Sequence, residues 1–236
     1  MKRILGLAAC SLLASQALAI SINEIRVDQP GTDNDEFFEL AGTPGASLSG
    51  LTYLVIGDDS GDGSGLNGKR SGSIEFALDL TGSSIPADGY FLAATSTFTG
   101  GSVDLTAGGA NLFENSDNVS HLLVSGFTGA LNDDLDTNND GVLDSMPWAS
   151  VVDAISLIET ANPPANNADE WDYGFGGGIG PDGTFVPGHV YRFANETGPW
   201  NIGIFEGDDI TPGIANLPEP ASLALIALGV LALRRR

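Results

Sequence analysis

The chain has 236 residues and carries 31 Asp and Glu against 9 Lys and Arg, a formal charge of -22. That field repels phosphate backbones and excludes a nucleic-acid partner bound through a basic groove. Hydrophobic residues make up 42% of the chain, enough for a packed core, and the single Cys excludes a disulfide framework or a Cys-rich zinc site.

The amino end has the features of a secretory signal peptide over residues 1–19. Lys2 and Arg3 precede an apolar run, and Ala-Leu-Ala at 17–19 fits the small-residue cleavage pattern. Cleavage there removes the lone Cys10 and leaves a mature chain without cysteine. A lipoprotein cleavage box that ends at Cys10 is the alternative, although the apolar stretch before it is short.

Residues 20–216 form the body, which we expect to be one all-β domain. Short apolar runs alternate with turn residues at intervals of about ten residues, the pattern of a β-sandwich or barrel. The 32 Gly and 12 Pro indicate frequent turns and long loops. Apolar spacing typical of a helix is approached only at 151–159, which is ambiguous between helix and strand. The predicted strands are residues 21–27, 36–41, 52–57, 73–80, 90–94, 120–126, 151–158, 190–194 and 200–205.

An acidic loop in the body has the spacing of a calcium-binding loop. Side-chain oxygens at alternate positions of a tight loop converge on one cation, and Gly141 at the sixth position permits the bend. Pro147 stands where an EF-hand has its closing Glu, and Asx-rich turns also form without metal. The predicted Ca²⁺ ligands are Asp136, Asn138, Asp140 and Asp144, with the backbone carbonyl of Val142.

Several other groups are weaker candidates. A second acidic stretch repeats part of the calcium spacing, and a cluster of three carboxylates offers the paired acids that a glycosidase needs. Two histidines are potential metal ligands or bases. Three tryptophans would favour sugar binding if they were exposed. Each also has an ordinary structural interpretation, as a turn, a solvated acid, a hydrogen-bonded imidazole or a core ring. The groups are Asp58, Ser60, Asp62 and Gly63; Asp169, Glu170 and Asp172; His121 and His189; and Trp148, Trp171 and Trp200.

Residues 217–236 have the order of a membrane anchor. Thirteen apolar residues, 221–233, span roughly 20 Å as a helix, less than the ~30 Å hydrocarbon core. Arginine side chains can snorkel, however, and the terminal Arg234, Arg235 and Arg236 favour a cytoplasmic end. We therefore expect a short transmembrane helix with the body outside the inner membrane.

The tail resembles the PEP-CTERM sorting signal of Gram-negative bacteria, because Pro218, Glu219 and Pro220 precede the apolar segment and the arginine cluster. The resemblance implies that the tail holds the exported protein transiently at the inner membrane. It also implies that an exosortase, a membrane Cys protease or transpeptidase, recognises the Pro-Glu-Pro triplet and processes the chain near it.

The body resembles a lamin-tail domain in patches. These are residues 22–25, 36–40, 48–55 and 211–213, with Asn216 at the close. The resemblance implies an immunoglobulin-like β-sandwich with long Gly- and Asp-rich loops, of a kind that occurs in exported bacterial proteins.

The sequence therefore predicts a non-catalytic exported protein of the cell surface or extracellular matrix. Its expected partners are an exosortase, the inner membrane and an extracellular polysaccharide, and its candidate cofactor is Ca²⁺. The alternatives are a secreted hydrolase acting on polysaccharide and an adhesion module for carbohydrate or protein.

Overall fold

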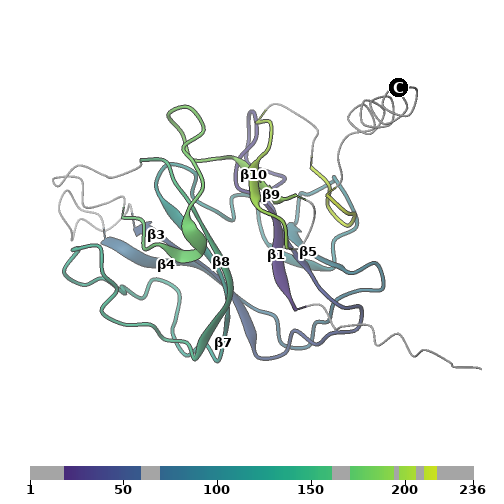
Figure 1. Cartoon of the computed structure of the whole chain (residues 1–236), viewed down its shortest axis with the longest axis horizontal. Helices are drawn as coiled ribbons and strands as arrows, with labels where there is room; N and C mark the ends of the chain where they lie inside the picture. Colours follow the sequence, from purple (N-terminus) through teal and green to yellow (C-terminus); the bar gives the residue numbers. More distant parts are fainter. Residues whose placement is uncertain (1–18, 60–69, 161–170, 194–196, 206–209, 217–236) are drawn as a thin grey trace, which may run out of the picture.

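The computed structural model describes residues 19–59, 70–160, 171–193, 197–205 and 210–216, which build two β-sheets packed face to face (Figure 1). The first sheet has the order β10 (Trp200–Ile202), β9 (His189–Arg192), β1 (Ser21–Arg26), β2 (Phe37–Ala41), β5 (Tyr90–Thr95) and β6 (Leu105–Gly108). The second has the order β4 (Arg70–Asp79), β3 (Leu51–Asp59), β7 (Val119–Ser125) and β8 (Ser150–Leu157).

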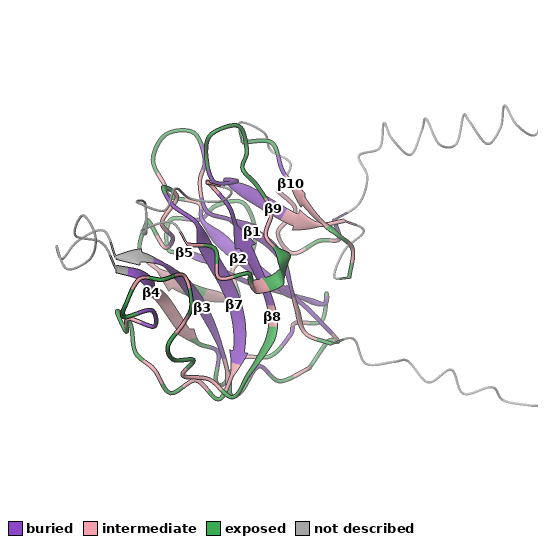
Figure 2. Ribbon diagram, turned by 60° about the vertical axis from the view of Figure 1, so that its left-hand side comes forward, coloured by how far each residue is buried: buried purple, intermediate pink, exposed green. Residues whose placement is uncertain are grey.

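The main core lies between the two sheets. Successive side chains of a strand point to opposite faces, so alternate residues of β2 and β3 meet in the middle. Phe38 of β2 stacks on Tyr53 of β3, with ring centroids 3.6 Å apart and planes within 5°. Figure 2 shows that the central strands are buried, whereas exposed residues lie mostly in the loops and in the first part of β8. Other members of this core are Ile22, Ile25, Leu40, Val55, Phe91, Leu123, Ile155 and Val190.

Loops cover the outer faces of both sheets. On β3, Leu54 and Ile56 point away from the main core into a second apolar cluster, which Phe127 and other residues of the long loops complete. On the first sheet, Phe37 and Leu92 form a third cluster with partly buried residues of the connecting segments. The long loops therefore belong to the packed body, and the outer face of the first sheet receives the end of the body's chain.

The prediction of an all-β, two-sheet architecture is confirmed. All nine predicted strands are present, and residues 151–158, which were ambiguous, form β8 because they pair along the length of β7. The short edge strand β6 was not predicted; it pairs in parallel with β5. The immunoglobulin-like, lamin-tail-like identity stays a prediction.

Both predicted address segments fall outside the described part of the chain. The signal peptide at 1–19 is described only at Ala19, and residues 217–236 are not described. Among the residues that the structure does describe, no helix has the length and apolar character needed to cross a membrane.

Candidate functional site

Two buried carboxylates oppose each other on the outer face of the first sheet. Glu24 of β1 and Glu39 of β2 are cross-strand partners, and both side chains are 0% exposed. Like charges directly opposite on antiparallel strands destabilise a sheet, and a buried charge is costly unless it is paired and hydrogen-bonded. The arrangement therefore requires donors from elsewhere in the chain.

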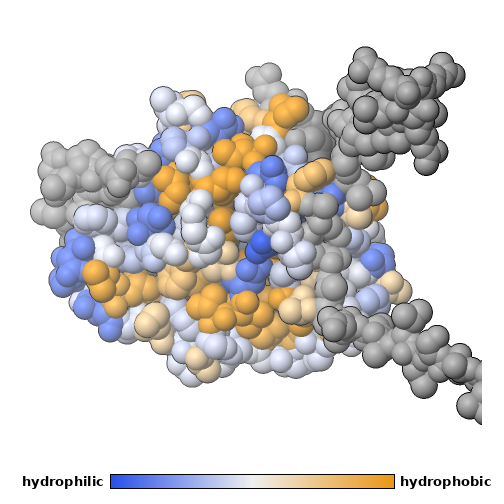
Figure 3. All heavy atoms as spheres, in the orientation of Figure 1, coloured by the Kyte–Doolittle hydropathy of each residue, from blue (hydrophilic) through white to orange (hydrophobic). Residues whose placement is uncertain are grey.

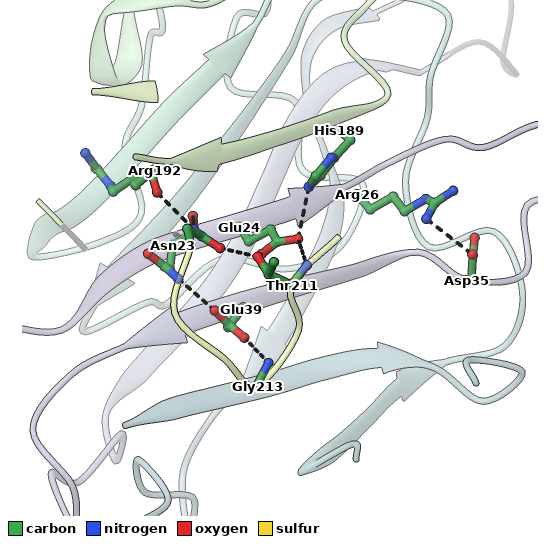
Figure 4. A network of polar contacts seen from close by, with 10 residues as sticks. Asn23, Glu24, Arg26, Asp35, Glu39, His189, Arg192, Thr211 and Gly213 are labelled. Carbon is green, nitrogen blue, oxygen red and sulfur yellow. Dashed lines mark hydrogen bonds and ion pairs between the residues drawn. The ribbon is translucent and has the colours of Figure 1, made fainter. Parts of the chain in front are cut away.

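The donors for Glu24 come from β9 and from residues 211–216, which we call the closing segment. His189 Nε2 lies 3.0 Å from Glu24 Oε1. Thr211 donates its backbone N–H to Oε1 at 2.8 Å and its hydroxyl to Oε2 at 2.6 Å. Figure 4 shows both side chains directed at the same carboxylate. The Glu24 carboxylate thus receives three contacts on its two oxygens.

Glu39 holds the next part of the closing segment. Asn23 Nδ2 donates to Oε1 at 2.8 Å, and the backbone N–H of Gly213 donates to Oε2 at 2.5 Å (Figure 4). Burial raises the pKa of Glu39 to about 8, with a smaller contribution from the Glu24 charge, although the two hydrogen bonds oppose the rise. This carboxyl therefore takes up a proton near neutral pH, which relieves the cross-strand repulsion.

The closing segment ends on a buried amide. Asn216 is 2% exposed, and its Nδ2 donates to the backbone oxygens of Asn23 at 3.4 Å and Arg192 at 3.0 Å. Its Oδ1 lies against the Thr211 hydroxyl, whose one proton is shared with Glu24 Oε2, so the segment is also closed on itself. Residues 211–216 consequently bridge β1, β2 and β9, and Asn216 is the last residue that the structure describes.

A neighbouring ion pair joins the two sheets beside this network. Arg192 of β9 places Nη2 3.0 Å from both carboxylate oxygens of Asp153 on β8. Asp153 also accepts the backbone N–H of Ile22 at 2.8 Å, and the Arg192 guanidinium lies 4.5 Å from the ring centroid of Trp200. The strand that carries Glu24 is thereby fixed to the second sheet as well.

The segment that begins where the closing segment ends matches a known sequence family. Residues 216–236 match the PEP-CTERM protein-sorting motif. The chain carries a PEP-CTERM sorting tail. The match begins at Asn216, so the last residue buried in the body is the first residue of the sorting tail. The predicted motif at Pro218, Glu219 and Pro220 and the arginines Arg234, Arg235 and Arg236 lie within the match, which supports an exported protein targeted by an exosortase.

The comparisons identify the tail alone. No curated protein and no solved structure matches the chain. The sandwich in front of the sorting tail is therefore interpreted from its own residues.

The predicted calcium loop is organised around Asp136, which is 0% exposed. Its Oδ1 accepts the backbone N–H of Asp140 at 3.1 Å, and its Oδ2 accepts the N–H of Gly141 at 2.9 Å and the hydroxyl of Tyr173 at 3.0 Å. Gly141 has φ 82°, the left-handed conformation that the predicted bend requires.

The other predicted ligands of this loop are exposed and bonded to one another or to the backbone. Asn138 Nδ2 donates to Asp140 Oδ2 at 3.0 Å, the N–H of Val142 donates to Asp140 Oδ1 at 3.0 Å, and Asp144 Oδ2 accepts the N–H of Thr137 at 2.9 Å. Within the described ranges no group of three or more His, Cys, Asp or Glu side chains is placed to hold a metal. Calcium binding at this loop stays a prediction.

The melting temperature in CaCl₂ checks that prediction. A bound ion raises the melting temperature in millimolar CaCl₂ by more than NaCl does at equal ionic strength, because the ion binds the folded state alone. Equal shifts in the two salts would mean that Ca²⁺ only screens the acidic surface. Asp140→Asn is the matched variant, and it should remove the excess shift produced by CaCl₂.

The histidines are placed as structural residues. Burial lowers the pKa of His121 to about 3, and its Nδ1 lies 3.0 Å from the hydroxyl of Tyr53 inside the core. His189 belongs to the Glu24 network.

Of the three candidate hydrolytic carboxylates, Asp172 is exposed and accepts the N–H of Gly174 at 2.8 Å. Asp169 and Glu170 lie outside the described residues, as do Ser60, Asp62 and Gly63 of the second acidic stretch.

Each candidate tryptophan is half-buried against a neighbour. Trp148 packs edge-on to Phe175 with centroids 6.2 Å apart, the Trp171 indole N–H donates to a backbone oxygen, and Trp200 lies beneath Arg192. Glu24 and Glu39, the residues that matter most here, were not predicted from the sequence. The available signal was a carboxylate in each of two apolar strands, together with the Thr-Pro-Gly turn just before the tail.

Proposed function

We propose that this protein is a non-catalytic exported component of the cell surface or extracellular matrix. Its tail holds it transiently at the inner membrane, and an exosortase then processes it near Pro218, Glu219 and Pro220. The observation that carries the proposal is the continuity at Asn216, where a residue 2% exposed in the body is also the first residue of the sorting match.

The spacing from body to membrane supports this order of events. Four residues lie between Asn216 and Ala221, where the apolar run begins, so five residue-to-residue steps join the two. An extended chain covers at most about 3.6 Å per residue, so the body is tethered within roughly 18 Å of the membrane segment. The Pro-Glu-Pro triplet lies in that interval, and an enzyme acting there works between a folded domain and the bilayer surface.

The roles of the described side chains support a non-catalytic body. His121 and His189 are 0% and 2% exposed, so neither imidazole can reach a substrate as a general base would. We also propose that the body is the lamin-tail-like, immunoglobulin-like sandwich that the sequence predicts, a proposal that the two-sheet architecture supports.

Replacing Pro218, Glu219 and Pro220 by alanine is expected to block processing in the native host. The wild-type protein should end near residue 220 and leave the membrane fraction, whereas the variant should keep every residue to Arg236 and stay membrane-bound. Intact-mass spectrometry of the carboxyl end measures this, and Asp182→Ala, an exposed change in the body, is the control. Equal trimming of the variant and the wild type would refute the proposal.

A further inference from the structure

A cleft of about 420 Å³ opens on the outer side of the second sheet, remote in sequence from the closing segment. Its walls are the paired ends of β3 and β4 and the start of the loop that follows β7, and its volume is within the range of small-ligand sites. The residues that give it chemical character are Thr52, Asp79, Thr81, Phe127, Gly129 and Leu131.

One side of the cleft is polar and anionic. Asp79 is exposed, and hydrogen bonds from Thr81, including a backbone N–H at 2.8 Å, lower the pKa of its carboxyl group. Asp79 therefore remains an ionised acceptor over the physiological range. The hydroxyl of Thr52 lies on the same lining and can donate and accept hydrogen bonds, whereas the hydroxyl of Thr81 donates to Asp79 and can still accept.

The opposite side of the cleft is apolar. Phe127 is half-buried and packs on the outer cluster of the second sheet, while Leu131 is 55% exposed. Gly129 lies close to the Phe127 ring, since a Cβ at this position would come within 2.9 Å of a ring carbon. On the face of the molecule that Figure 3 displays, the apolar surface forms separate patches among polar residues.

We propose that this cleft binds sugar units of an extracellular glycan that lack carboxylate or sulfate groups. A pyranose has hydroxyls that can donate to Asp79 and an apolar face that can pack on Phe127 and Leu131. No Lys, Arg or His lines the described cleft, and the chain carries a formal charge of -22. An anionic sugar would therefore meet a like charge without a compensating cation.

The inference deepens the proposed function by naming the ligand class of the exported body. It does not depend on processing of the tail, because the cleft is formed by residues 50–131. Loss of sorting and loss of glycan binding are consequently separate results.

Affinity electrophoresis of the purified protein at pH 7 and 0.15 M NaCl tests the proposal with three polymers: hydroxyethyl cellulose, chitosan oligomers and alginate. We expect hydroxyethyl cellulose (the neutral polymer) or chitosan (the amino polymer) to retard the protein, and alginate to have no effect. No retardation by either of the first two, or equal retardation by alginate, would overturn the assignment. At 1 M NaCl, retardation that persists supports the cleft, whereas its complete loss indicates binding by the acidic surface in general.

Two variants locate the binding. Asp79→Asn should weaken affinity about tenfold, because a hydrogen bond to a charged acceptor is stronger than one to a neutral amide. Leu131→Ser should weaken it as well, through loss of apolar contact.

The matched control is Asp88→Asn. Asp88 is an exposed aspartate outside the cleft, and like Asp79 it accepts a backbone N–H two residues ahead, from Tyr90 at 3.0 Å. Equal affinity of the Asp79 and Asp88 variants would place the binding elsewhere and reject this cleft.

Discussion

Glu24→Ala is expected to lower the free energy of unfolding by about 3–5 kcal/mol, the range found when one partner of a buried ionic network is removed. The substitution leaves His189 Nε2 and the backbone N–H of Thr211 without the acceptor that they share. Because the whole stability of a domain is about 5–15 kcal/mol, a loss of this size is a large part of it. The closing segment should also open, since two of its contacts end on Glu24.

Urea denaturation followed by tryptophan fluorescence measures the loss, and limited proteolysis reports the opening at residues 211–216. Asp182→Ala is the control, because Asp182 is exposed, and it should change stability by less than about 0.5 kcal/mol. Glu24→Gln keeps one acceptor and should fall between the two. A Glu24→Ala protein as stable as the Asp182 variant would show that the network does not hold the segment.

The free energy of unfolding should decrease as the pH rises from about 5 to 8. Burial raises the pKa of Glu39 to about 8 from its ordinary 4.5, so over this interval the folded state binds a proton that the unfolded state has lost. Stability therefore falls with pH, by up to about 1.4 kcal/mol per pH unit for one such proton. Burial also raises the pKa of Glu36 to about 7, which contributes to the same trend below neutrality.

Glu39→Gln separates the two contributions. The amide keeps an acceptor for the N–H of Gly213 and cannot ionise, so its stability curve should be flatter than that of the wild type between pH 7 and 8. Glu36→Gln should flatten the curve mainly below pH 7. Urea midpoints at half-unit pH steps supply the data, and parallel curves for the Glu39 variant and the wild type would contradict the assignment of the raised pKa to Glu39.

The strands were predictable because the body obeys period-two patterning wherever one face is buried. β2 is the clearest case, since Phe38 and Leu40 face the main core while Phe37 faces the outer cluster. β6 was missed because a strand of four residues with no fully buried side chain carries no such pattern. Its pairing is imposed by β5, which is a tertiary effect.

The sorting tail was predictable and its attachment to the body was not. The tail is local, since its triplet, apolar run and arginines are contiguous. The attachment joins positions far apart, with Glu24 receiving Thr211 across 187 residues and Asn23 receiving Asn216 across 193. In the sequence alone, the polar residues of β1 only interrupt the apolar pattern that predicts a strand. Only the paired register of β1 and β2 shows that Glu24 of β1 faces Glu39 of β2 and that both carboxylates need donors from elsewhere in the chain.

The docking of the closing segment has a consequence for the order in which the chain becomes native. Biosynthesis proceeds from the amino end, so β1 and β2 exist long before Thr211 and Gly213 are made. Until then the outer face that carries the two glutamates lacks the segment that supplies several of their hydrogen-bond donors. The closing segment therefore completes the sandwich, which reaches its final form only when the residues that lead into the sorting tail have been made. Folding of the domain is therefore completed at the same point of synthesis at which the sorting tail begins.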